Sequence, residues 1–94
     1  MTTKRNGGPL TFAQVICSER KCMELSQKAF AKKLGISVSH LCDIEKGRKL
    51  VSPERACLFA KKLQYPAIGF IQYALQDQLS HNGLKKYRVE VKAA

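Results

Sequence analysis

The chain has 94 residues, of which 45% are hydrophobic and 26% charged, a usage that fits one globular domain and excludes wholesale disorder. The 17 Lys and Arg residues against 7 Asp and Glu give a net charge of +10, which favours a polyanionic partner, either nucleic acid or an anionic membrane surface. No apolar run is long enough to span a bilayer, and we expect no secretory signal at the N-terminus.

The four cysteines are scattered along the sequence, which indicates a reducing compartment and predicts a cytoplasmic protein. Cys17 and Cys57 fall on apolar faces and are expected to fill the core. Without a C-x-x-C pair, the sequence predicts no zinc site and no other metal site.

Catalytic motifs are missing from the sequence. The stretch His40-Leu41-Cys42-Asp43 contains a base, a nucleophile and an acid, but neighbours along one helix point in different directions. There is no phosphate-cradling glycine loop, nucleophile elbow or metalloprotease motif. We therefore expect a protein that is not an enzyme and needs no cofactor.

Residues 1–9 are polar and include Gly7-Gly8-Pro9, which predicts a flexible basic arm. Lys4 and Arg5 in this arm either reach around a duplex or belong to a disordered tail. A first helix is predicted from Thr11 to about Cys22 by the spacing of its apolar residues.

Two short helices follow, separated by a single glycine. Ser26 is a good N-cap for a helix over residues 27–34, and Gly35 supplies a left-handed stop. Ser37 caps a third helix that runs to about Lys46, where Gly47 ends it.

The fourth and fifth helices complete the predicted set. Ser52-Pro53-Glu54 combines a cap, a proline and an acid, and starts a helix that ends at about Leu63. The fifth helix is predicted from Pro66 to Leu79, with Asn82-Gly83 as its stop. Its apolar residues cover more than one helical stripe, so a second surface needs cover, most simply from another copy of the chain. The helix residues assigned to this dimer interface are Phe70, Ile71, Tyr73 and Leu75.

After the fifth helix, the alternation of Tyr87, Val89 and Val91 with charged residues predicts a short β-strand. No other segment has this pattern, so the strand needs a partner from outside the chain. It pairs either with the same strand of a second copy or with the edge of another protein, while a frayed tail is the plainer alternative. The three apolar residues complete the predicted dimer interface.

The two short central helices are marginal in isolation, so packing must hold them together. Phe30 and Ala31 on the first are predicted to face Leu41 and Ile44 on the second, across the turn at Gly35. This arrangement leaves the start of the second helix outside the core. Two helices joined at a steep angle by a short turn with glycine form the helix-turn-helix, whose second helix fits a DNA major groove.

The chain resembles the Xre/Cro phage-repressor-type helix-turn-helix family over roughly residues 11–65, at Leu25-Ser26-Gln27, Phe30-Ala31, Leu34-Gly35-Ile36-Ser37, Ile44-Glu45-Lys46-Gly47 and Ser52-Pro53. The resemblance implies an all-α five-helix bundle of the lambda-repressor-like type, which binds operator DNA as a homodimer. In these terms residues 10–65 form the DNA-binding core, and residues 66–94 form the dimerisation helix and strand of the same domain. A partly buried ion pair between Arg20 and Glu45 is also implied.

The resemblance further implies that Val38, Ser39 and Asp43 face base edges. Val38 can pack on a thymine methyl group, Ser39 can hydrogen-bond most bases, and Asp43 can accept from a cytosine amino group or repel phosphate. Relatives often carry glutamine or another neutral or basic polar residue where Val38 and Asp43 stand, a departure that bears on the operator sequence more than on the fold.

The remaining predicted DNA contacts are to phosphate. The resemblance places Gln27 on a phosphate and Ser37 and His40 near the strand backbone. Lys28, Arg48 and Lys49 flank the reading helix and suit phosphate contacts, which position a protein and give most of the salt dependence. For Lys32 and Lys33 a solvated helix face is an equal alternative.

These patterns together predict a dimeric, sequence-specific DNA-binding regulator that acts as a repressor. The main alternative is an antitoxin, which uses the same dimer to repress its own operon and also masks a toxin protein. An interaction adaptor without DNA binding is a third possibility. Membrane binding is disfavoured, because the basic helices turn their apolar faces to the core.

Overall fold

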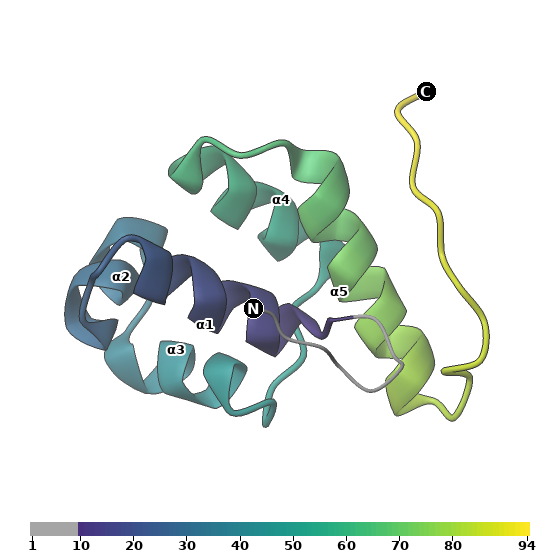
Figure 1. Ribbon diagram of the computed structural model, residues 1–94, viewed down its shortest axis with the longest axis horizontal. Helices are drawn as coiled ribbons and strands as arrows, with labels where there is room; N and C mark the ends of the chain where they lie inside the picture. Colours follow the sequence, from purple (N-terminus) through teal and green to yellow (C-terminus); the bar gives the residue numbers. More distant parts are fainter. Residues whose placement is uncertain (1–9) are drawn as a thin grey trace.

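The computed structural model describes residues 10–94; the predicted basic arm, residues 1–9 with Lys4 and Arg5, lies outside the described residues. The described residues form an all-α bundle (Figure 1), confirming the predicted fold class. Its helices lie within two residues of the predicted bounds: α1 Phe12–Cys22, α2 Gln27–Leu34, α3 Val38–Glu45, α4 Pro53–Leu63 and α5 Ala67–His81.

Side chains with a hydroxyl group cap the start of four of these helices. Thr11, Ser26, Ser37 and Ser52 each accept a hydrogen bond from the backbone N–H three residues further on, which satisfies a donor that has no partner inside the helix. At the end of α2, Gly35 has a φ of 78°, a left-handed conformation that glycine adopts without steric cost. The chain therefore turns sharply between α2 and α3, as the sequence predicts.

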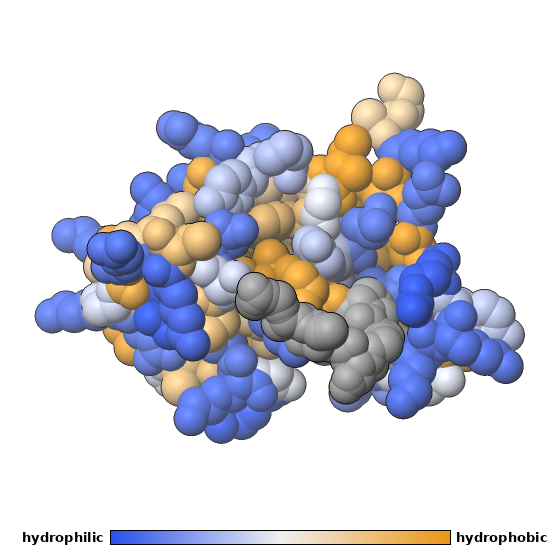
Figure 2. All heavy atoms as spheres, viewed as in Figure 1, coloured by the Kyte–Doolittle hydropathy of each residue, from blue (hydrophilic) through white to orange (hydrophobic). Residues whose placement is uncertain are grey.

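The core lies where all five helices meet, and Figure 2 shows apolar side chains near the middle of the face drawn. Its fully buried large side chains are Phe12, Ile16, Phe30, Leu34, Leu41, Ile44 and Phe59. Helix α5 packs mainly along α4 and also contacts α1. None of the helices within residues 10–94 combines the length and the apolar character that a membrane crossing requires.

The predicted dimer surface on α5 needs one correction. Phe70 is only 5% exposed and belongs to the core, where its ring meets Phe12 edge-to-face at 5.6 Å. The prediction that Phe70 lies at a dimer interface is therefore wrong, because this position of α5 faces α1. Tyr73 also packs against the core cluster. Ile71 and Leu75 are partly buried outside that cluster and remain available for a partner.

The C-terminal segment does not form a β-strand, and residues 10–94 contain no strand at all. Tyr87, Val89 and Val91 were predicted to lie in a strand; instead they lie in an extended tail that runs back along α5 (Figure 1). The physical reason is that the rest of residues 10–94 offers no second strand to pair with it. Side-chain amides of α5 supply hydrogen bonds to the tail backbone instead.

Candidate DNA-binding surface

Two buried side chains fix helix α3 on the rest of the molecule. Leu41 is fully buried and Ile44 is 1% exposed, and α3 packs against both α2 and α1. Because these residues hold one face of the helix, its first turn is left on the surface. Val38 is 42% exposed there, and Ser39 next to it is also exposed. The apolar side chain of Val38 is therefore accessible to a partner at the start of α3.

The predicted ion pair between Arg20 and Glu45 is present and joins α1 to the end of α3. Arg20 donates to both carboxylate oxygens of Glu45, with Nε–Oε2 at 2.7 Å and Nη2–Oε1 at 3.2 Å. Its third nitrogen, Nη1, donates to the carbonyl of Leu25 at 3.1 Å. The side chains are 17% and 6% exposed, so the pair holds the orientation of α3 in a place largely screened from water.

The environment of Glu45 lowers the pKa of its carboxyl group. Burial alone would raise this pKa, but hydrogen bonds from Arg20 and Gln27, together with the Arg20 charge, outweigh the burial. The hydrogen bond with Glu45 in turn raises the pKa of Arg20, so both groups stay ionised over the neutral range. The contact with Gln27 is a 3.0 Å bond from its Nε2 to Glu45 Oε1. The side-chain amide of Gln27, which the resemblance assigns to a phosphate, is therefore hydrogen-bonded to α3 when no DNA is bound.

Asp43 and Arg48, predicted to contact DNA in separate roles, form an ion pair with each other. The Arg48 Nε donates to Asp43 Oδ1 at 3.0 Å, with the side chains 58% and 29% exposed. The backbone amide of Arg48 also donates to the Asp43 carbonyl at 2.8 Å. Sequence reasoning missed this pairing, although two opposite charges on either side of the turn at Gly47 are a signal that could have suggested it.

Ser37 and His40 are linked by the helix cap at the start of α3. The Ser37 Oγ accepts from the His40 backbone N–H at 3.0 Å. The hydroxyl proton of Ser37 is not used by this bond and can be donated to a phosphate oxygen. The His40 side chain is partly exposed beside it.

Exposed cations surround this surface on α2 and on the loop after α3, at Lys28, Lys32, Lys33, Lys46, Arg48 and Lys49. Apart from Arg48, these side chains form no ion pair within residues 10–94. The first two residues of α3, Val38 and Ser39, are uncharged, and the neighbouring helix α2 and the loop after α3 carry positive charge, which suits a groove lined by phosphates.

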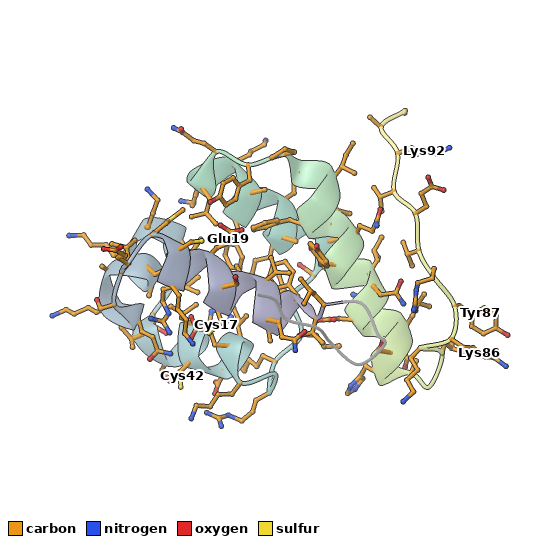
Figure 3. The ribbon with its side chains drawn as sticks, viewed as in Figure 1. Cys17, Glu19, Cys42, Lys86, Tyr87 and Lys92 are labelled. Atoms are coloured by element: carbon orange, nitrogen blue, oxygen red, sulfur yellow. The ribbon has the colours of Figure 1, made fainter. Side chains whose placement is uncertain are left out.

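The described residues contain no group of three or more side chains that could hold a metal ion. The four cysteines are free thiols, and Cys17 and Cys57 are partly exposed rather than buried core residues. Cys17 lies on α1 and Cys42 on α3 (Figure 3). The Cys42 sulfur accepts a weak hydrogen bond from Arg48 at 3.9 Å.

Comparison with known proteins identifies this arrangement. Residues 19–70 match a protein family described as helix-turn-helix, and this segment is more than half of the chain. No curated protein sequence and no solved structure matches the chain. The matched segment runs from α1 through both helices of the turn to α5. The chain therefore belongs to the Xre/Cro-type helix-turn-helix family of DNA-binding transcriptional regulators.

Proposed function

We propose that the protein is a sequence-specific repressor that binds an inverted-repeat operator as a homodimer. The observation that carries the proposal is the exposed start of α3, where Val38 and Ser39 stand clear of the core. Buried Leu41 and Ile44 and the Arg20–Glu45 pair hold this helix rigidly. Occupancy of promoter DNA is sufficient for repression, whereas activation needs a further contact with the polymerase.

In this proposal Val38, Ser39 and Asp43 read base edges. Val38 packs on a thymine methyl group and Ser39 hydrogen-bonds the neighbouring base. Asp43 accepts from a cytosine amino group, and its ion pair with Arg48 fixes the direction of the carboxylate. Phosphate contacts come from Gln27, Lys28, Ser37, His40, Arg48 and Lys49.

A titration with DNA tests the proposal most directly. The protein is titrated into its own upstream DNA and into a scrambled duplex of the same length, at several salt concentrations. We expect binding that weakens steeply with salt and a strong preference for the upstream DNA. Equal and weak binding to both duplexes would favour the adaptor and contradict the proposal.

Variants then separate phosphate contacts from base contacts. Arg48→Ala should weaken binding to every duplex and reduce the salt slope by about one. Lys92→Ala is the matched control, since Lys92 is an exposed cation of the tail, far from α3 (Figure 3). Val38→Gln should instead change the base preferred at one position in a selection from random DNA; an unaltered motif would remove Val38 from the readers.

An antitoxin that represses its own operon is a second candidate. Large apolar side chains are exposed away from α3, with Leu58 of α4 at 53% and Ile68 of α5 at 42%, and such residues favour a protein partner. The test is co-expression with the product of the adjacent gene. A complex of defined mass that relieves growth inhibition by that product supports the antitoxin, and separate elution of the two proteins leaves the simple repressor.

A further inference from the structure

The extended C-terminal tail is held on α5 by two glutamine side chains. Gln76, only 5% exposed, donates from Nε2 to the Tyr87 carbonyl at 2.7 Å and accepts at Oε1 from the Val89 N–H at 2.9 Å. Gln72 accepts from the Val91 N–H at 3.0 Å. Residues four apart on a helix rise about 6 Å, close to the roughly 6.6 Å that two residues span in an extended chain. The glutamines therefore take the place of a neighbouring strand.

The opposite edge of the tail has no such cover. Backbone groups of successive residues in an extended chain point to opposite sides. The Tyr87 carbonyl and the N–H groups of Val89 and Val91 bond to α5, while the Tyr87 N–H bonds to the Leu84 carbonyl in the turn. By this alternation the N–H and C=O groups of Arg88 and Glu90 point away from α5. Within residues 10–94 these four groups have no hydrogen-bond partner. The tail thus presents an open strand edge, a template for another strand.

We infer that this edge pairs antiparallel with the same tail of a second copy, in the register centred on Val89. This register sets Arg88 opposite the partner's Glu90 and, by symmetry, Glu90 opposite the partner's Arg88. The inference rests on the proposed homodimer and assigns its central contact. A dimer with two-fold symmetry uses the same patch on both copies, and an antiparallel strand pair satisfies this condition.

Hydrogen bonding restricts the possible registers, and charge selects among them. The outward backbone groups belong to Arg88 and Glu90. In a hydrogen-bonded register, each of these residues therefore lies opposite either the other residue of the partner or its own counterpart in the partner. Centring the pair on Arg88 would place arginine against arginine, and centring it on Glu90 would place glutamate against glutamate. Within the extended segment that starts at Tyr87, only the register centred on Val89 sets opposite charges against each other twice. Opposite charges directly across a strand pair are stabilising, whereas like charges are destabilising.

The neighbouring positions fit the same register. Tyr87, which is 53% exposed, lies opposite the partner's Val91, an aromatic and β-branched combination that favours strand pairing. One position further out, Lys86 would lie opposite the partner's Lys92, so two like charges would face each other. Lys86 belongs to the turn before the extended segment and points away from α5 (Figure 3), so the paired region begins at Tyr87.

Charge reversal in the full chain tests the pairing. Arg88→Glu alone and Glu90→Arg alone each place like charges at both symmetric pairs, and each should raise the dimer dissociation constant about tenfold or more. The double variant R88E/E90R restores opposite charges and should return to within about threefold of the original value. Lys85→Glu, in the turn outside the paired region, is the control for net charge. Sedimentation over a range of protein concentrations measures the constants.

Two results would overturn the inference: a chain that stays monomeric at all concentrations, or a double variant that dimerises no better than the single ones. In either case the tail edge would be free for a different protein. Each variant is also titrated with a duplex that carries one half-site, which a monomer can bind. Failure of the unmodified chain to bind the half-site would count against the proposed function, and a chain that binds the half-site but stays monomeric would count against the homodimer as well as the strand pairing. A dimer that the double variant does not restore would count against the strand pairing alone.

Discussion

At the scale of single residues, the ion pair between Asp43 and Arg48 sets how strongly the surface attracts DNA of any sequence. Asp43 lies in α3 and Arg48 in the loop that follows it, and the carboxylate partly neutralises the cation that we propose for a phosphate contact. The proposed repressor must avoid the large excess of non-specific DNA, and an internal counter-charge lowers that background.

Asp43→Ala should therefore raise affinity for non-specific DNA. Without the counter-charge, the phosphate contact of Arg48 becomes stronger and one negative charge is removed from the DNA-facing surface, so we expect tighter binding and a steeper salt slope. Binding to random-sequence duplex at several salt concentrations measures the slope. Glu54→Ala, which removes an exposed acid from the start of α4, is the control, and an identical response of both variants would show that only net charge matters.

The Arg20–Glu45 pair acts on stability instead. Glu45→Ala leaves the Arg20 guanidinium largely buried without its partner, and should lower the free energy of unfolding by roughly 3 kcal/mol in urea at pH 7. The variant R20M/E45M leaves no unpaired charge, and should lose less than the sum of the two single changes. Strictly additive losses would argue that the two side chains do not interact in the folded protein.

The lowered pKa of Glu45 also gives this contribution a pH dependence. A carboxyl group whose pKa falls on folding stabilises the folded state above its unfolded pKa of about 4.3. That stabilisation is lost as the pH falls through the lowered folded value. The difference between the unmodified chain and Glu45→Ala should therefore shrink in acid.

At the scale of helices, the sequence predicts the elements well because their ends are chemically marked. Ser26, Gly35, Ser37 and Ser52 are each the residue type that a cap or a stop needs, and the exposed start of α3 follows from them. Such local signals do not specify how a helix rotates against its neighbours, and for this reason Phe70 was predicted at the wrong surface.

In the candidate site, too, local sequence signals predict some features, while contacts between distant residues are not predicted. The exposure of Val38 follows from helical spacing around Leu41 and Ile44, which the sequence displays. The contact of Gln76 with the tail crosses 11 and 13 residues and uses a side chain with no periodic pattern. Alternation at the C-terminus predicts a β-strand, which does not form in the single chain, and it does not show that glutamines of α5 would bond to the tail backbone.

A carboxylate of α5 accepts a hydrogen bond from the first residue of α1 and helps to hold the two helices together. Asp77 Oδ2 accepts from the Phe12 backbone N–H at 3.1 Å, at the start of α1. Burial raises the pKa of Asp77 by more than this hydrogen bond lowers it. A raised pKa means that the stabilising contribution is present below about pH 4, the ordinary value for aspartate, and is lost as the pH rises through the folded value.

Asp77→Asn should remove this loss, since an amide oxygen can still accept from Phe12 but carries no charge to desolvate. Relative to the unmodified chain, the free energy of unfolding of the variant should rise between pH 4 and pH 7. Urea unfolding at a series of pH values measures the change. Glu24→Gln, an exposed acid, should show no comparable rise, and a flat difference for Asp77→Asn would contradict the assigned role of burial.

At the scale of the whole molecule, the dimensions of the protomer agree with two copies on one face of a duplex. Its principal extents are 35, 32 and 24 Å, so two copies side by side can place their reading helices about 34 Å apart, one turn of DNA. The cations on α2 and on the loop after α3 then follow the phosphates on either side of each half-site.

Inserting five base pairs between the operator half-sites should abolish the advantage of the dimer. The insertion rotates one half-site by about half a turn of DNA, so only one reading helix can engage. Affinity should fall to that of a duplex with a single half-site, measured by the same titration. Undiminished binding to the lengthened operator would indicate protomers that act independently.

The glutamine contacts on the tail also give the molecule a distinctive pattern of amide exchange with deuterated water. In a single copy the amides of Val89 and Val91 are bonded to α5 and should exchange slowly, while those of Arg88 and Glu90 should exchange at nearly the rate of an unstructured peptide. Strand pairing would slow the second set without altering the first. Alternate residues along four consecutive positions of the chain would thus report separately on folding and on association.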